Sequence, residues 1–440
     1  MIKITRKKII GLILFSPLFA MAQTPAIDLS LDKAVELALA ENPTIRVADK
    51  EIEIKKVADK ETWQSLLPSV TADLALSHSI KVAAIKTAMG EFKMGMDGST
   101  TATGGITMTL PLFAPAVYQN MKLTKEDIKL AQEKARASRL DLVNQVTKAY
   151  YSALLAKDSK EVIEKSYKLA SDNFNVVNNK FINGRVSEYD KISAEVQMRT
   201  MKSSVVSAET GLNLALLQLK VLMGIDTNID ININDSLKAY EEMLVLSNTQ
   251  ATDAELANNS VLKQLDQNKT MLQRARKILR TGFMPTIAMQ LTGQYNSYSN
   301  DNWNIFGYKY SPSSTLALAV SIPIFKANNW TKLQSNRIQL AQLQDTRDNT
   351  ERQLSMAARS YRDNMIKTIS KIESDREAVK QADKAVSISA KRYDVGRGTI
   401  LELNQSETAL VQAELAYHQS IYDFLQNKAD LDYTLGREWK

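Results

Sequence analysis

Residues that could act as nucleophiles, metal ligands or proton carriers are scarce in this sequence. The 440 residues include no cysteine, so the chain forms no disulfide and offers no thiolate to a metal or a substrate. The two histidines, His78 and His418, leave a zinc enzyme or a histidine-based catalytic triad very little to work with. We therefore expect no enzymatic activity, no cofactor and no metal site.

Glycines that recur at a fixed spacing are more informative. The segment Phe181–Arg185 resembles the segment Tyr393–Arg397, and the glycines of the two segments, Gly184 and Gly396, are offset by 212 positions. Glycine is the residue that most readily adopts the left-handed conformation in which one helix can turn back into another. Each segment therefore predicts a tight turn between two helices.

Other landmarks show that most of the chain is an internal duplication. Pro111 and Pro323 have the same offset, whereas the earlier pair, Pro68 and Pro285, has an offset of 217 positions. One five-residue length difference between Pro68 and Pro111 accounts for both offsets. The sequence thus divides into a signal peptide, a first repeat, a linker and a second repeat, at residues 1–22, 23–224, 225–253 and 254–440.

Each repeat contains two segments in which apolar residues alternate with small or polar ones. Leu316, Leu318 and Val320, for example, alternate with Ala317 and Ala319, which is the pattern of a strand with two different faces. Each segment has about ten residues, enough for a tilted strand to cross the hydrocarbon of a membrane. A soluble sheet with one buried face would show the same alternation. The predicted strands cover about 69–80, 102–113, 286–297 and 314–325.

Two long stretches, residues 116–181 and 326–393, contain neither proline nor glycine. A helix of about 65 residues is about 100 Å long. Tyr167, Phe174 and Phe181 follow one another at heptad spacing, which predicts a coiled-coil seam. The shorter helices predicted on either side, such as 43–67 and 186–223, add up to one long helix when stacked end to end. We therefore expect a rod two helices wide in each repeat, with the linker at the break.

The N-terminus has the pattern of a secretory signal. A basic region precedes the short apolar run Ile9–Phe19 and the small-residue site Ala20–Ala22, so the mature chain is expected to begin at Gln23. Removing four cations lowers the formal net charge from +7 to +3, which argues against nucleic acid as a partner. No run of 18 consecutive apolar residues follows, so we expect no transmembrane helix and a closed β-barrel if the protein spans a membrane.

Four strands cannot close into a barrel, and an open edge would leave backbone groups unpaired in lipid. Eight strands leave room only for side chains, whereas twelve is the smallest multiple of four that leaves an open lumen. This closure argument predicts three copies of the chain, with twelve strands and twelve helices around one axis.

The ordered set of landmarks resembles the TolC-type outer-membrane efflux family over essentially all of the mature chain. The matching features are the duplication, Asn42-Pro43, Leu110–Phe113 with Ile322–Phe325, and the segment Tyr393–Leu403 around the second turn. The resemblance implies an α+β membrane protein in which a homotrimer forms a twelve-stranded β-barrel continuous with a twelve-helix periplasmic α-barrel. It also implies an outer-membrane location and a role as the exit duct of a tripartite efflux or type I secretion system.

The same resemblance implies roles for residues at the periplasmic tip. Glu402 and Gln405 match positions that line the narrow end of the channel, and three copies of Glu402 would form a carboxylate ring that favours cations. Asp190 and Tyr393 match positions that tie the two hairpins together. A cation that some relatives use for this tie falls at Gly398, and Arg397 or Arg185 is expected to replace it. The residues expected to contact an adaptor are Asn183, Gly184, Arg185, Val395, Gly396 and Arg397.

The implied partners are a periplasmic adaptor, an inner-membrane pump and the lipid bilayer. The pump would be a resistance–nodulation–division or an ABC transporter, and the sequence favours neither one nor any particular cargo. The alternative hypothesis is a periplasmic coiled-coil scaffold without a pore, in which the strands would not contact lipid.

Overall fold

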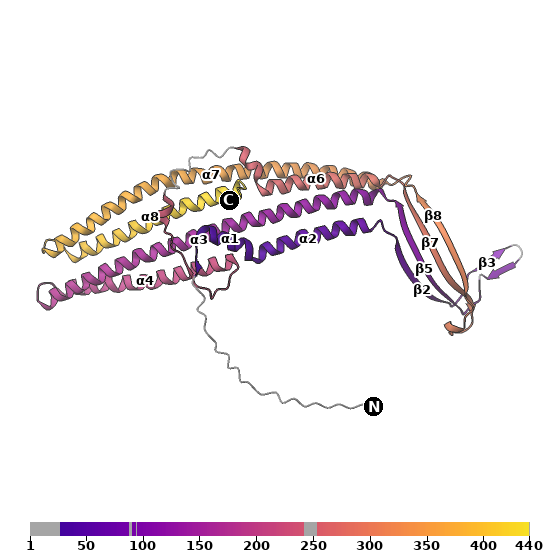
Figure 1. Cartoon of the computed structure of the whole chain (residues 1–440), viewed down its shortest axis with the longest axis horizontal. Helices are drawn as coiled ribbons and strands as arrows, with labels where there is room; N and C mark the ends of the chain where they lie inside the picture. The colour runs from indigo at the N-terminus through magenta and orange to yellow at the C-terminus, as the bar shows by residue number, and fades with distance from the viewer. Residues whose placement is uncertain (1–26, 88–89, 94, 242–252, 440) are drawn as a thin grey trace, which may run out of the picture.

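The computed structural model describes residues 27–87, 90–93, 95–241 and 253–439. The predicted signal peptide, residues 1–22, lies outside this part of the chain. The protein is a long helical rod with an antiparallel sheet at one end and two helical turns at the other (Figure 1). The predicted α+β fold, with two long helical hairpins and a four-stranded sheet, is confirmed.

Both repeats contain the same principal elements in the same order. The first consists of α1 (Leu31–Glu41), α2 (Pro43–Gln64), β2 (Ser69–Ser79), β5 (Ser99–Phe113), α3 (Pro115–Ile182) and α4 (Glu188–Met223). The second consists of η2 (Asp253–Asn258), α6 (Ser260–Thr281), β7 (Thr286–Asn300), β8 (Ser311–Ser321), α7 (Ala327–Asp394) and α8 (Ile400–Thr434). Short elements lie in the loops and the linker: β1 (Ile27–Asp28), β3 (Ala84–Thr87), β4 (Gly90–Lys93), β6 (Ile231–Asn232), η1 (Leu237–Tyr240) and η3 (Ile305–Gly307).

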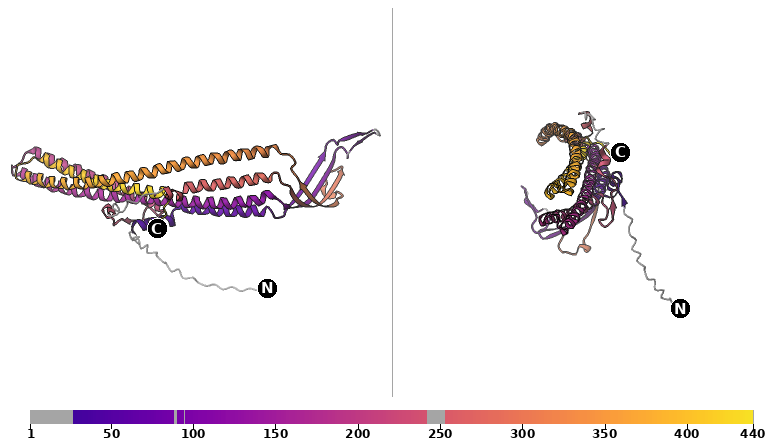
Figure 2. Two further views of the ribbon diagram at one scale, coloured as in Figure 1. Left: turned by 90° about the horizontal axis from the view of Figure 1, so that it is seen from above. Right: turned by 90° about the vertical axis from the view of Figure 1, so that its left-hand side faces the viewer.

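The long helices α3 and α7 run the full length of the rod. Each has 68 residues, which corresponds to about 100 Å. Near the sheet the neighbouring helices are α2, α3, α6 and α7, and toward the far end they are α4, α3, α8 and α7. Viewed along the rod, these helices form a curved layer rather than a closed bundle (Figure 2). Much of the helical surface therefore stays exposed in a single protomer.

An asparagine and a glycine join each return helix to an entry helix. In the first repeat the side chain of Asn42 caps α2 by accepting from the Thr44 N–H (2.8 Å), and its Nδ2 donates to the Leu222 carbonyl of α4 (2.7 Å). Gly224 ends α4 with a φ of 71°. A Cβ at Gly224 would lie 2.9 Å from the Asn42 Cα, so only glycine lets the two helix ends approach this closely.

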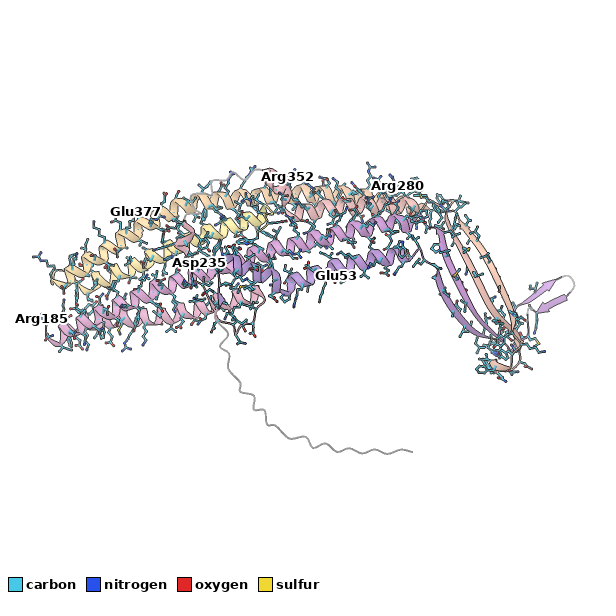
Figure 3. All side chains as sticks on the ribbon, in the orientation of Figure 1. Glu53, Arg185, Asp235, Arg280, Arg352 and Glu377 are labelled. Carbon is cyan, nitrogen blue, oxygen red and sulfur yellow. The ribbon has the colours of Figure 1, made fainter. Side chains whose placement is uncertain are left out.

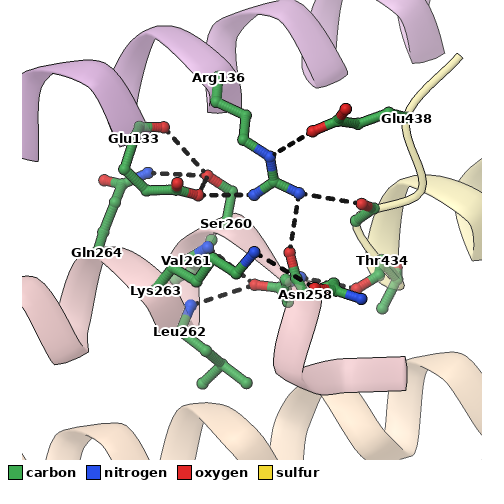
Figure 4. Close-up of polar contacts among 12 residues, drawn as sticks. Glu133, Arg136, Asn258, Ser260, Val261, Leu262, Lys263, Gln264, Thr434 and Glu438 are labelled. Atoms are coloured by element: carbon green, nitrogen blue, oxygen red, sulfur yellow. Dashed lines mark hydrogen bonds and ion pairs between the residues drawn. The ribbon is translucent and has the colours of Figure 1, made fainter. Parts of the chain in front are cut away.

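The second joint repeats this arrangement between α8 and α6 (Figure 4). Asn259 accepts from the Val261 N–H (2.8 Å) and donates to the Thr434 carbonyl (2.7 Å). Gly436 has a φ of 67° and lies against the Asn258 backbone. Stacked pairs of short helices thus match the length of one long helix in both repeats.

Arg136 of α3 clamps the second joint (Figure 4). Its guanidinium donates to the carbonyls of Asn258 and Gly436 (3.1 Å each) and pairs with the carboxylates of Glu133 (2.7 Å) and Glu438 (2.8 Å). The residue at the equivalent position of α7 in the duplication is Asp348. The two joints therefore share their asparagine cap but differ in this clamp.

The four principal strands form one antiparallel sheet in the order β2-β5-β7-β8. The β2–β5 and β7–β8 pairs are the hairpins of the two repeats, and β5–β7 joins the repeats. Among the described residues, β2 and β8 pair with a strand on one side only. Apolar side chains such as Leu74 (88% exposed) and Leu318 (65% exposed) have no cover in the protomer.

Strand boundaries differ from the prediction in three of the four strands. β5 begins at Ser99 and β7 extends to Asn300, whereas the predicted strands covered 102–113 and 286–297. β8 covers Ser311–Ser321 rather than 314–325, and its last residue pairs with Thr286, the first residue of its partner β7. An unpredicted hairpin, β3 and β4, extends from the loop between β2 and β5 (Figure 1).

The main apolar core lies near the middle of the rod, where the linker packs on the helices. Tyr150, Leu237 and Phe424 are fully buried there. β1 pairs in parallel with β6 in the linker, and the Tyr150 hydroxyl donates to the Asp235 carboxylate (2.7 Å). Residues 242–252 of the predicted linker lie outside the described part of the chain.

We expected no helix able to cross a membrane. α4 differs from this expectation, because it is long enough and apolar enough to do so by length and composition alone. This helix contains an 18-residue stretch that is apolar enough, and only 6% of that stretch is buried. Its apolar residues are interrupted by polar ones, so a search for consecutive apolar residues does not find it. Val206, Leu214 and Val221 are each more than half exposed.

Candidate gate and docking tip

The end of the rod opposite the sheet consists of two hairpins with the same turn. Gly184 follows α3 with a φ of 67°, and Gly396 follows α7 with a φ of 72°. In both turns the N–H of the residue after glycine donates to a carbonyl five residues earlier, at 2.8 Å, which is the Schellman arrangement. A Cβ added at either glycine would meet no atom within 4 Å, so the backbone conformation alone requires glycine here.

All six residues predicted to dock an adaptor are exposed at this end: Asn183, Gly184, Arg185, Val395, Gly396 and Arg397. Arg185 marks the far end of the rod in Figure 3. Two apolar side chains accompany the arginines, since Ile182 is 72% exposed and Val395 is 68% exposed. The tip thus presents a small surface of mixed cationic and apolar character.

Glu402 and Gln405, the predicted gate residues, lie on the exposed side of α8 just beyond the second turn. The Glu402 backbone N–H donates to the Thr399 hydroxyl that caps the helix (3.2 Å). The Glu402 carboxylate pairs with the Arg392 guanidinium of the same hairpin (3.4 Å). The prediction missed Arg392, because sequence spacing does not reveal a contact that crosses a turn.

Asp190 and Tyr393, which match positions that tie the two hairpins in relatives, make no hydrogen bond to each other in the protomer. The Asp190 carboxylate accepts from the Ser187 N–H (3.2 Å) in a capping box at the start of α4. The Tyr393 hydroxyl is buried and has no hydrogen-bond partner among the described residues. Burial raises the pKa of Tyr393, and the nearby negative charge of Asp190 raises it further. The two residues are neighbours without a direct bond.

Lys180 of α3 supplies the cation that joins the two hairpins. Its Nζ pairs with the Asp394 carboxylate at the end of α7 (3.0 Å) and lies 5.2 Å from the centre of the Tyr393 ring. Arg185 and Arg397, the predicted replacements, are not part of this tie. Gly398 packs closely against the turn, because an added Cβ would lie 3.1 Å from the Arg392 Cβ, so a side chain there would require Arg392 to shift.

Further polar contacts connect the return helices α4 and α8 close to the tip. The Asn404 amide donates to the Ser193 hydroxyl (3.2 Å), and the Gln197 amide donates to the Thr408 hydroxyl (3.4 Å). These contacts border a groove of about 560 Å³ whose lining also includes Gln405. These hydrogen bonds add to the apolar packing between the two hairpins near the tip.

Glu407 is the most buried acidic residue near the tip. It is 2% exposed, and Asn173 of α3 donates to its carboxylate. Burial raises the pKa of Glu407 to about 7, against an opposite effect of the Asn173 hydrogen bond. The apolar residues Val177, Ile400 and Leu403 pack nearby in the same part of the rod. The contact between the two hairpins thus includes a carboxyl group that can change charge near neutral pH.

A family model described as "Outer membrane efflux protein" matches residues 34–225 and 251–437, which together make up most of the chain. The protein belongs to the outer membrane efflux protein family. The two matched segments fall on the two repeats, on either side of the linker. Members of this family are outer-membrane channels rather than enzymes, and the protein is accordingly an outer-membrane efflux or secretion channel by family.

Characterised relatives of this efflux family cover most of the chain. The alkaline protease secretion protein AprF of Pseudomonas aeruginosa is 22% identical over 428 residues, which are 96% of this chain and 88% of AprF. The outer membrane protein TolC of Escherichia coli is 22% identical over 441 residues, covering 92% of this chain and 82% of TolC.

Solved channels of similar fold support the same assignment. VceC of Vibrio cholerae gives a TM-score of 0.72 at 14% identity, covering 92% of this chain and 96% of VceC. CusC gives a TM-score of 0.75 at 15% identity, covering 93% of each chain. The open state of the Neisseria gonorrhoeae MtrE channel gives a TM-score of 0.70 at 17% identity, covering 92% of this chain and 88% of MtrE. The curved helical layer and the small sheet therefore have the fold of these solved outer-membrane channels.

Proposed function

We propose that three copies of this chain form the exit duct of a tripartite efflux or type I secretion system, without catalysis of its own. The observation that carries this proposal is the open sheet. β2 and β8 have unpaired outer edges among the described residues, and Leu74, Leu316 and Leu318 are exposed on it. Unpaired backbone groups at these edges are unstable in lipid unless other copies continue the sheet, whereas the exposed leucines are unfavourable in water and favourable against lipid.

The edges of the helical layer support the same assembly. In the half of the rod toward the tip, α4 lies at one edge, where Val206, Leu214 and Val221 are exposed, and α7 lies at the other, where Ile366 and Ile388 are exposed. A second copy placed beside the first would bring an apolar edge of each together. This arrangement accounts for a helix as apolar as α4 that is hardly buried in its own protomer.

Arginine substitutions on the two faces of β8 test the barrel. Leu318→Arg would place a cation against lipid, at a cost of about 2–4 kcal/mol per subunit near the middle of the bilayer. The neighbouring Ala317→Arg is the matched control, because adjacent strand residues point to opposite faces. We expect detergent-stable trimers from the outer membrane for Ala317→Arg and their loss for Leu318→Arg. A mature protein that purifies as a soluble monomer would contradict the duct and favour the pore-free scaffold.

At the tip, we propose that Glu402 forms a ring around the axis and that the six exposed turn residues contact a periplasmic adaptor. The Lys180–Asp394 pair and the Asn173–Glu407 contact would hold this end narrow. Planar-bilayer recordings provide the test. We expect Lys180→Gln to increase single-channel conductance and Glu402→Gln to reduce the preference for cations over anions. Unchanged conductance and selectivity in both variants would argue against a gate at this end.

The partner proteins, which include the pump, determine the cargo. AprF is by name a protease secretion protein, so a secreted protein and a small exported molecule are both within the proposed class. The inner-membrane partner would be an ABC or a resistance–nodulation–division transporter. Cross-linking from cysteines introduced at Arg185 and Arg397 into a cysteine-free chain would capture the adaptor in whole cells. Failure to capture one protein at both sites would count against docking at the turns.

A further inference from the structure

The helical segments that border the strands differ strongly in charge between the two repeats. In the second repeat, residues 267–281 and 326–343 contain eight lysines and arginines and no aspartate or glutamate. The matching residues of the first repeat, 50–64 and 114–131, contain seven basic and six acidic residues. We call the former segments the basic collar. Duplication alone would have given both repeats the same charge.

Most cations of the basic collar have no partner in the protomer. Arg274 pairs with Glu126 (3.2 Å), and Lys269 donates to the Gln344 amide oxygen (2.7 Å). In the part of the chain that the structure describes, the other collar cations make no ion pair, and the Nε of Arg276 is buried without a hydrogen-bond partner. The exposed and unpaired cations are Lys277, Arg280, Lys326, Lys332 and Arg337.

Most of these cations lie close to the helix ends that border the strands. Lys277 and Arg280 occupy the last turns of α6, and Lys332 lies five residues into α7. These three are within about 8 Å of the ends of their helices next to the strands, whereas Arg337 lies about 15 Å along α7. A head-group layer is about 5–8 Å thick. Figure 3 places Arg280 where the helices give way to the strands.

An aromatic pair marks the same level. The rings of Phe283 and Trp330 lie 5.1 Å apart, and Trp330 is 64% exposed, as expected of a tryptophan at a membrane interface. Trp330 and Arg337 are two helical turns apart and so share one face of α7, while Lys277 and Arg280 are one turn apart on α6. The membrane-interface tryptophan and a collar cation therefore lie on the same helix face.

We propose that the basic collar binds the anionic phosphate head groups of the periplasmic leaflet of the outer membrane. The inference rests on the proposed barrel, because it needs the strands to span the bilayer. Clustered cations next to a membrane-spanning segment attract anionic lipid, and salt weakens the attraction. Each trimer would then hold such lipid at three places, next to the second repeat and not the first.

Lipid retention by matched variants tests the proposal. The collar variant combines Lys277→Gln, Arg280→Gln, Lys326→Gln and Lys332→Gln. The control variant removes the same number of charges from the first repeat, with Lys56→Gln, Lys60→Gln, Lys122→Gln and Lys125→Gln. Detergent-extracted trimers would be mixed with phosphatidylglycerol, phosphatidylcholine or inorganic phosphate, and the bound lipid counted by native mass spectrometry. We expect wild type and control to prefer phosphatidylglycerol, and the collar variant to lose about ten-fold in that preference.

Equal preferences in the two variants, or no preference in wild type, would overturn the inference. The inference would also be overturned if inorganic phosphate competed for the collar as well as phosphatidylglycerol does, since that result would indicate an ion site rather than a lipid site. A collar variant that changes ion selectivity but retains its lipid would place the cations in the lumen and also refute the proposal. Trimer formation and conductance are measured separately in each sample. If the wild-type protein formed no trimer or did not conduct, the proposed exit duct would be contradicted. A wild-type trimer that conducts but shows no lipid preference would contradict only the proposed lipid binding by the basic collar.

Discussion

The two return helices, α4 and α8, are equivalent in the duplication but differ in their surroundings. They contain 36 and 35 residues, yet α4 buries only Ala194, Leu219 and Met223, whereas α8 buries eleven residues. The reason is position, because α8 packs against both α3 and α7 while α4 packs mainly on α3. A duplicated path of the chain thus gives one interior helix and one edge helix, and the apolar residues of the edge helix need a second copy to cover them.

The largest expected difference between the two helices is in their apolar residues. Phe424 of α8 is fully buried and Leu214 of α4 is 66% exposed. Phe424→Ala should destabilise the fold by about 3–5 kcal/mol through loss of burial and a residual cavity. Leu214→Ala should cost the protomer less than about 1 kcal/mol but weaken the trimer. Denaturant unfolding followed by circular dichroism, together with sizing in detergent, separates the two effects. Equal loss of protomer stability would show that α4 is not an edge.

The membrane-side ends of the two helices should differ next. Arg136 holds the end of α8 through two carbonyls and two carboxylates, so Arg136→Gln should cost about 2 kcal/mol. At the corresponding end of α4, Lys220 donates to one exposed carbonyl, that of Thr227 (3.0 Å). Lys220→Gln should therefore cost less than about 0.5 kcal/mol. Unfolding midpoints of the two variants provide the measurement, and similar midpoints would remove the distinction between the joints.

The third difference concerns pH. The raised pKa of Glu407, at about 7, means that the folded state favours the protonated carboxyl. The contribution of protonated Glu407 to the free energy of unfolding is therefore complete below the ordinary carboxyl pKa and is lost as pH rises through about 7. Glu407→Gln should increase stability by about 1–2 kcal/mol at pH 8 and by little at pH 5.

The matched control is Glu195→Gln at the equivalent position of α4, where the carboxylate pairs with Arg199 (2.7 Å) and stays partly exposed. This change should have an effect below about 0.5 kcal/mol at both pH values. Melting temperatures at pH 5 and pH 8 measure the difference. A pH-independent effect of Glu407→Gln would mean that the carboxyl is not the titrating group.

The smallest effect is expected at the starts of the two helices. Glu402 pairs with Arg392 at the surface, whereas Asp190, its equivalent, completes a capping box. Glu402→Gln should change stability by less than about 0.5 kcal/mol, and Asp190→Ala by about 1 kcal/mol. Thermal unfolding of both variants checks the order. If Glu402→Gln proved the more destabilising change, the contact with Arg392 would be structural rather than available for gating.

Local patterns in the sequence were sufficient for the principal helices and strands and their order, although not for the β3–β4 hairpin. The absence of glycine and proline gave α3 and α7 to within one residue at each end, and Gly184 and Gly396 gave the two turns. The tip contacts were less predictable. Lys180 and Asp394 lie 214 residues apart, and no periodicity relates them. The resemblance placed Asp190 among the residues that tie the hairpins, and in the protomer its carboxylate accepts from the start of its own helix, three residues away.

By itself, the sequence determined the duplication, because landmarks recur at a constant offset. It also determined the alternating strands, the unbroken long helices and the positions of the turns, because these depend on residues near one another in the chain. Only the tertiary structure decided which return helix is interior, which lysine ties the hairpins and how deeply Glu407 is buried. Those properties depend on contacts between surfaces that are more than two hundred residues apart in the sequence. Backbone propensity does not determine such long-range contacts, because it acts over a few residues at a time.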